Sequence, residues 1–94
     1  MSVVNISIGQ LVTSVAGRDR MQVYLVVGIK NSKVLLLVNG RERKMANPKQ
    51  KNIRHVNVLK SIAKGMAEKI QSGAKVTDEE IRQTIQVLYK PDNL

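Results

Sequence analysis

The chain has 94 residues, of which 43% are hydrophobic, 24% are charged and none is cysteine. These values predict one small globular domain with a thin core, argue against a disordered chain, and exclude a disulfide framework or a thiolate metal site. Sixteen Lys and Arg against seven Asp and Glu give a net charge of +9, which favours a polyanionic partner.

The first half of the chain predicts short β-strands joined by turns. β-branched residues mix with small polar ones in residues 9–16, which end at a Gly-Arg-Asp-Arg turn. Two apolar runs follow, Val23–Ile29 and Val34–Val38, separated by the polar turn at residues 30–33. The second run is apolar on both faces, which is typical of a strand covered on both sides.

Asn39-Gly40 follows the second apolar run and is a strong hairpin signal. Both residues accept the positive φ that a type I′ turn requires. The dipeptide therefore predicts that residues 41–46 form a strand that folds back on residues 34–38. In that register Leu36 would lie opposite Arg43.

The predicted hairpin ends at Asn47-Pro48, because proline cannot donate a hydrogen bond to a ladder. Residues 49–52 are then predicted as a loop. Residues 53–59 alternate again and predict a short last strand. Four or five short strands with tight turns predict a small curled sheet or barrel.

From residue 59 the apolar period changes to that of a helix. The first predicted helix ends at Ser72-Gly73, where glycine supplies the left-handed C-cap conformation. The second begins with a capping box, in which Thr77 is the N-cap and Glu80 the third helical residue, and it ends before Pro91. The two apolar stripes comprise Leu59, Ile62, Ala63, Met66 and Ile70, and then Ile81, Ile85, Leu88 and Tyr89.

The predicted fold class is mainly β with C-terminal helices. A sheet domain occupies residues 1–58 and a two-helix extension occupies residues 59–94. Neither helix is long enough to be stable alone in water. The helices must therefore pack on each other, on the sheet or on a partner, and the sequence leaves these alternatives open.

No combination of residues predicts catalysis, a metal site or a cofactor. The single histidine, His55, has no cysteine or nearby acid beside it, and one histidine cannot build a metal site or a triad. We expect it to be hydrogen-bonded or exposed. The acids at residues 78–80 are explained by the start of a helix. "GIKNSK" lacks the second glycine and the Lys-Ser/Thr pair of a P-loop.

The positive charge is concentrated in residues 1–60, which hold eleven of the sixteen bases and only two acids, Asp19 and Glu42. Residues 61–94 hold five bases and five acids. Such sorting is typical of a protein that binds a polyanion, whereas the alternative is a solvated hairpin whose lysines protect an edge strand. The candidate RNA-binding residues are Arg18 and Arg20 on the first turn, and Arg41, Arg43, Lys44, Lys49, Lys51 and Arg54 after the Asn-Gly turn.

Aromatic residues limit the mode of binding, because the chain contains only Tyr24 and Tyr89. Proteins that bind single strands of any sequence use several aromatic stacking platforms. We therefore expect binding through phosphates, sugar hydroxyls and the shape of a folded RNA. The charge alone leaves DNA open as a partner, but both helices are near neutral, so no recognition-helix pattern carries the charge. Met21, Met45 and Met66 are predicted to fill the core.

The stretch "IGQLVTSVAGRDRMQVYLVVGI" resembles a KOW motif, in which a Gly-basic-Asp-basic turn joins two alternating strands. The continuation "KVLLLVNGRERKMANPKQKNIRHV" is similar to the KOW domain-containing RNA-binding proteins of bacteria, which are related to KOW-bearing large-subunit ribosomal proteins. The resemblance covers residues 6–58, and residues 73–81 also look like the tail of that bacterial group.

This resemblance implies an SH3-like β-barrel whose loops and basic hairpin contact structured RNA such as ribosomal RNA. It places contacts at the candidate residues given above. The chain departs from the family at Met21, where a second glycine is usual after the turn. Glycine there would allow a positive φ or a close approach of the backbone to RNA.

The predicted function is non-catalytic RNA binding in ribosome- or translation-associated work. The alternative is a protein-interaction module of a transcription or translation complex, which docks through its neutral amphipathic helices. "MSVVNISIGQ" predicts no signal peptide, and no run approaches the roughly 20 apolar residues of a membrane span. We therefore expect a cytoplasmic protein without membrane partners.

Overall fold

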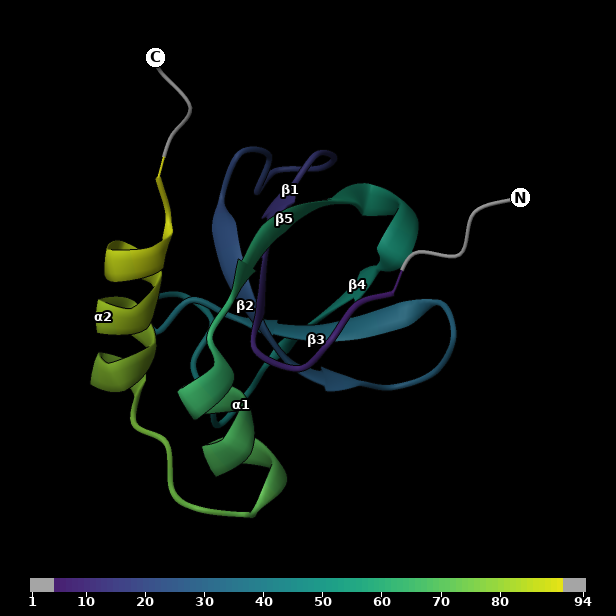
Figure 1. Cartoon of the computed structure of the whole chain (residues 1–94). Coiled ribbons are helices and arrows are strands. Elements are labelled where there is room, and N and C mark those ends of the chain that lie inside the picture. The colour runs from purple at the N-terminus through teal and green to yellow at the C-terminus, as the bar shows by residue number, and fades with distance from the viewer. Residues whose placement is uncertain (1–4, 91–94) are drawn as a thin grey trace.

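A curved antiparallel sheet of five strands carries two helices on one of its faces (Figure 1). The computed structural model describes residues 5–90; Pro91, the predicted helix stop, lies outside this range. The strands are β1 (Gln10–Ser14), β2 (Val23–Ile29), β3 (Val34–Val38), β4 (Lys49–Asn52) and β5 (Val56–Ile62). A short 3₁₀ turn, η1 (Ile53–His55), joins β4 to β5, and the helices are α1 (Lys64–Gln71) and α2 (Asp78–Leu88).

The strand order is β4-β3-β2-β1-β5, so β4 and β5 form the two edges. The prediction of a mainly β fold with two C-terminal helices is confirmed. The sheet is not closed into a barrel, and the finer prediction of an SH3-like barrel is not confirmed. The predicted domain division after residue 58 falls inside β5.

The predicted strand at residues 41–46 is wrong. Residues 39–48 form a loop, and β4 pairs with β3 instead, with Leu36 opposite Gln50. The cause is Asn39, whose side-chain oxygen accepts from the backbone amides of Arg41 at 2.9 Å and Arg43 at 3.0 Å. These bonds close a compact local turn, which replaces the two-residue hairpin.

The boundary between the last strand and the first helix also differs from the prediction. β5 continues to Ile62, which pairs with Gln10, and the amide of Ala63 donates to the carbonyl of Gly9 at 2.7 Å. Leu59 and Ile62 therefore belong to a strand, although their spacing also suits a helix. Helix α1 begins at Lys64 and ends at Ser72-Gly73, where Gly73 has the expected positive φ of 81°.

Two hydrophobic clusters stabilise the sheet, one on each face. One is buried against the helices and contains Leu11, Leu25 and Val38 from the strands with Met66 and Ile81 from the helices. The other lies on the opposite face and contains Val12, Tyr24, Val26, Leu35 and Leu37. Met66 and Ile81 are thus buried on the sheet, other members of the helical stripes pack partly buried against the same cluster, and α1 and α2 pack within this chain.

The second helix begins as the sequence predicts. Thr77 and Glu80 form a complete capping box, and Ile81 is fully buried. Of the three methionines predicted to fill the core, Met66 is buried and Met45 packs against the same cluster, but Met21 is 77% exposed. No helix within residues 5–90 has the length and apolar character needed to cross a membrane.

Candidate nucleic-acid interface

Two basic loops lie at the same end of the sheet. The first basic loop (residues 15–22) joins β1 to β2, and the second basic loop (residues 39–48) joins β3 to β4. The antiparallel register brings them together, because the start of β2 runs beside the end of β3, with Leu25 opposite Val38. Their exposed or half-buried bases are Arg18, Arg20, Arg41, Arg43 and Lys44, and Lys49 follows at the start of β4.

Asp19 connects the first basic loop to β4. One of its carboxylate oxygens accepts from the Ser14 hydroxyl at 2.8 Å and from the Lys51 ammonium at 2.9 Å. The other accepts from the Tyr24 hydroxyl at 2.9 Å, with the Lys49 ammonium 3.4 Å away. Partial burial raises the pKa of Asp19, but these donors together outweigh it and hold the pKa well below its usual range.

Lys51 has a different role from the one that the sequence predicts. Its side chain is only 10% exposed, and its ammonium donates to the Ala16 carbonyl at 2.9 Å as well as to Asp19. This geometry holds the first basic loop against β4 and leaves the ammonium turned inward. Lys49 is 25% exposed and can contact both Asp19 and an anion in solution.

Tyr24 belongs to the Asp19 cluster, and the next residue along β2, Leu25, pairs with Val38 just before the second basic loop. Burial raises the pKa of its hydroxyl, and the hydrogen bond to Asp19 and the charge of Asp19 raise it further, so the hydroxyl stays a donor. Arg43 and Glu42 from the second basic loop also act on this hydroxyl through their charges.

Helix α2 holds the second basic loop from the other side. The Arg82 guanidinium donates to the Gly40 carbonyl at 2.6 Å, and the Met45 amide donates to the Asp78 carboxylate at 2.8 Å. The sequence suggests for Asp78 only a role at the start of the helix, and no local signal pairs either side chain with a loop more than thirty residues away. Both contacts arise from the tertiary fold.

Arg54 belongs to neither basic loop. It lies on η1 and lines a hollow of about 260 Å³ together with Lys33, Asn52 and Ile53. Lys33 is thus a basic residue of this second surface that the sequence analysis missed. In the sequence Lys33 is only a charged residue in a turn, and most surface turns contain such a residue.

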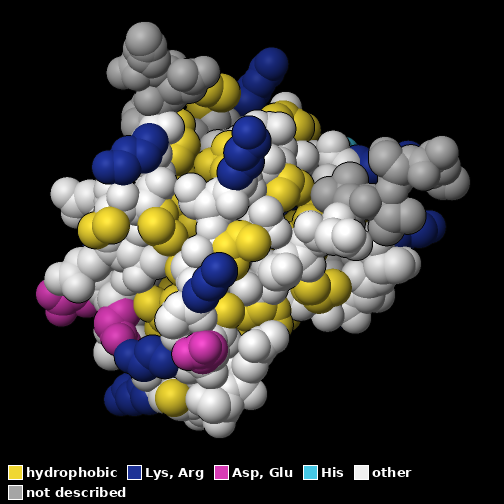
Figure 2. Space-filling model, viewed as in Figure 1, with side chains coloured by type: hydrophobic (Ala, Val, Ile, Leu, Met, Phe, Trp, Pro, Cys, Tyr) yellow, Lys and Arg dark blue, Asp and Glu magenta, His cyan; other side chains and the backbone are white. Residues whose placement is uncertain are grey.

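The acidic side chains of the helical part lie together on one face of the molecule (Figure 2). In the face that Figure 2 shows, the acidic side chains gather over α1 and the beginning of α2, and none is seen over the strands. One of them, Glu80, pairs with Lys69. Within residues 5–90, no group of three or more His, Asp or Glu side chains is placed to hold a metal ion.

No protein-family model matches the sequence, and no curated protein matches it either. The resemblance to KOW proteins therefore rests on residues 6–58 and 73–81 of the sequence alone.

Proposed function

We propose that this protein binds structured RNA without catalysing a reaction, through phosphate contacts from its two basic loops. The observation that supports this most is that the two basic loops lie at the same end of the sheet, where Asp19 fastens the first of them to β4. The proposed contacts are Arg18, Arg20, Arg41, Arg43, Lys44 and Lys49, with Arg54 and Lys33 on the separate surface beside η1. Lys51 is left out because its ammonium is bound internally.

A fixed arrangement of cations favours a folded partner. The first basic loop is fastened to β4 through Asp19, and the second is fastened to α2 through Arg82. Rigid cations match phosphates whose spacing is itself fixed, as in a folded RNA, and neither loop carries an aromatic side chain for stacking on single-stranded bases. The KOW resemblance favours a ribosomal or translation-associated RNA as the partner. It also favours an interpretation of the sheet as an open variant of the SH3-like barrel.

The competing proposal, a module that docks on proteins through its helices, has less support. Its apolar stripes would have to be free, yet Ile81 is fully buried and Met66 is 8% exposed in the cluster shared with the sheet. Val87 is the large apolar residue of α2 that stays exposed. One such residue is normal on a protein surface.

The test is a salt titration of RNA binding by a loop variant and a matched control. Each phosphate contact contributes about 0.7–0.9 to the slope of log affinity against log salt concentration. Arg41→Ala with Lys44→Ala should lower that slope by about 1.4–1.8. Lys64→Ala with Lys75→Ala removes the same charge from exposed positions in the helical part and should leave the slope unchanged.

Equal slopes for the two double variants would contradict the proposed interface. Circular dichroism of each variant checks that the fold is kept. If binding by the wild-type protein shows no salt dependence, phosphate contacts do not drive it, and the proposed function fails.

A further inference from the structure

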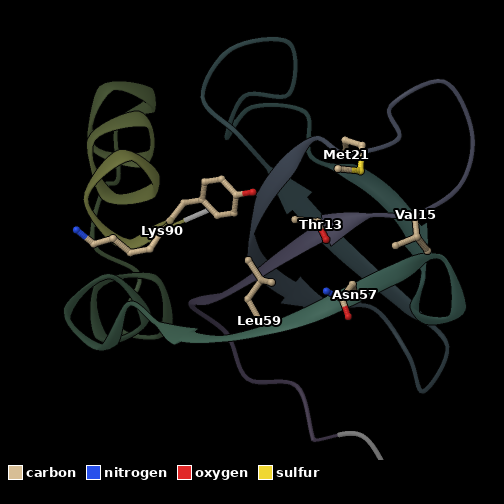
Figure 3. Close-up of a pocket in the computed structure, with 7 residues that line it drawn as sticks. Thr13, Val15, Met21, Asn57, Leu59 and Lys90 are labelled. Atoms are coloured by element: carbon tan, nitrogen blue, oxygen red, sulfur yellow. The ribbon is translucent and has the colours of Figure 1, made fainter. Parts of the chain in front are cut away.

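A hollow of about 410 Å³ opens beside the first basic loop, on the helix-covered face of the sheet and past the end of α2 (Figure 3). Thr13 on β1 and Asn57 and Leu59 on β5 form its sheet side, and Lys90 lies beyond α2. Met21 from the first basic loop stands at the opposite rim. The proposed phosphate contacts Arg18 and Arg20 lie on the same loop.

The rim of this pocket is held in a strained conformation. Met21 has a φ of 76°, in the left-handed region that non-glycine residues rarely adopt. Its backbone is fixed there, because its amide donates to the Ser14 carbonyl at 2.8 Å and the Ser14 amide donates to Gln22 at 2.9 Å. The side chain nevertheless stays 77% exposed, and such strain around an exposed apolar group is often associated with binding sites.

The lining combines apolar side chains with a few polar groups. Val15, Met21 and Leu59 supply apolar walls, and Tyr89 supplies an aromatic ring. Thr13 and Asn57 add hydrogen-bonding groups, and a side-chain amide offers both donors and an acceptor. The lining holds a cation, Lys90, and no acid, and Arg20 precedes Met21 in the chain.

We propose that this pocket takes one unstacked base of the bound RNA, an inference that rests on the proposed function. The base would pack against Tyr89 and Met21 and meet the amide of Asn57, while Arg20 and Lys90 contact the phosphates on its two sides. A nucleotide joins a flat apolar ring to anionic groups. The ring matches the apolar side chains of the lining, and the anionic groups match its cation. An acidic peptide with an apolar side chain is the competing occupant.

The test uses two RNA hairpins that differ only in the loop, one with adenosines and one with abasic nucleotides. Their charges are equal, so phosphate contacts alone cannot distinguish them. The wild-type protein should bind the adenosine hairpin about tenfold more tightly, as expected for one stacked base. The side-chain amide resonance of Asn57 should shift only with the adenosine hairpin.

Tyr89→Ala and Asn57→Ala should each reduce this preference, while Val87→Ala, an exposed apolar residue outside the pocket, should keep it. Asn57 is exposed on an edge strand, so its variant tests the pocket even if Tyr89→Ala disturbs the helix end.

Equal affinity for the two hairpins would overturn the base pocket and leave the phosphate interface intact. A preference that survives in both pocket variants would place the base elsewhere and also overturn it. If neither hairpin binds at low salt, the proposed function fails and the pocket proposal with it. A shift of the Asn57 amide with an acidic peptide alone would assign the pocket to a protein partner.

Discussion

The Arg82 guanidinium on α2 lies 2.6 Å from the carbonyl oxygen of Gly40, at the start of the second basic loop. Gly40 and its neighbour Asn39 are buried, so this carbonyl depends on a partner within the protein. Asp78, at the start of the same helix, holds the Met45 amide farther along the loop. The helical part of the chain, which carries no net charge, thus fixes the geometry of the cations.

We predict that Arg82→Ala weakens RNA binding although Arg82 is not a proposed RNA contact. The variant leaves the Gly40 carbonyl without its donor, which should lower the free energy of unfolding by about 1–3 kcal/mol. The second basic loop should become less ordered, so affinity should fall several-fold. Urea denaturation and RNA titration measure the two effects.

Lys75→Ala is the control, because it removes one positive charge from an exposed position. It should change neither stability nor affinity by a comparable amount. If Arg82→Ala and Lys75→Ala behave alike in the RNA titration, general charge and not loop order accounts for the loss.

Asp19→Asn should destabilise the fold and reduce its dependence on pH. The variant leaves the inward Lys51 ammonium without its counter-charge, and we expect a loss of about 2–4 kcal/mol at neutral pH. In the wild-type protein the folded state holds the pKa of Asp19 below its usual value of 3.8. Its stabilising effect is therefore fully present above that value and is lost as the pH falls below it.

Urea denaturation at about pH 7 and about pH 3 tests this prediction. The difference in unfolding free energy between wild type and Asp19→Asn should shrink at the lower pH. Glu80, whose pKa is lowered to about 2 mainly by the hydrogen bond from Lys69, keeps some acid sensitivity in both proteins. A constant difference between the two proteins would mean that the Asp19 charge does not stabilise the fold.

Gly40 and Gly73 both have a positive φ, so the effects of their substitution by alanine on stability can be compared directly. A Cβ at Gly40 would lie 2.5 Å from the Asp78 carbonyl oxygen, whereas a Cβ at Gly73 would meet nothing within 4 Å. Gly73→Ala should therefore cost only the conformational penalty of about 1–2 kcal/mol. Gly40→Ala should cost more than about 3 kcal/mol, because the second basic loop must also move away from α2.

Thermal melts of the two variants distinguish these expectations. Equal losses of stability would show that the close approach of the second basic loop to α2 contributes nothing. A larger loss at Gly73 would contradict the packing described here.

The elements that the sequence predicted well are those with local determinants. The bounds of β2 and β3 match the prediction because each apolar run is flanked by turn residues within the chain. The capping box at Thr77 and Glu80 involves residues three positions apart, so its residue types alone identify it. Local patterns fix such elements whatever the tertiary fold.

The features that the sequence missed depend on residues far apart. Asn39-Gly40 favours a two-residue hairpin, but the Asn39 side chain closes a different local turn, and Asp78 and Arg82 hold the resulting loop from far along the chain. The sequence shows that Lys51 is charged, but the direction in which its side chain points depends on Asp19, which lies 32 residues earlier. The candidate residues thus include a lysine, Lys51, whose ammonium is turned inward and holds the first basic loop against β4.

Met21 provides the last prediction, because two substitutions separate its strain from its side chain. Met21→Gly removes both the backbone strain and the side chain. The free energy gained by relieving the positive φ should exceed the free energy lost through the extra conformational entropy that glycine gives the unfolded chain. We expect the free energy of unfolding to rise by about 0.5–1 kcal/mol. Met21→Ala keeps the strain and should leave stability near the wild-type value, because the side chain is mostly exposed.

Both variants remove one wall of the proposed base pocket, so both should reduce the preference for the adenosine hairpin over the abasic one. In Met21→Gly the loss of base preference would accompany a gain in stability, which misfolding cannot produce. Urea denaturation and the paired hairpin titrations measure the two quantities on the same samples. A stabilised Met21→Gly protein that keeps the full base preference would show that Met21 forms no part of the RNA-binding surface.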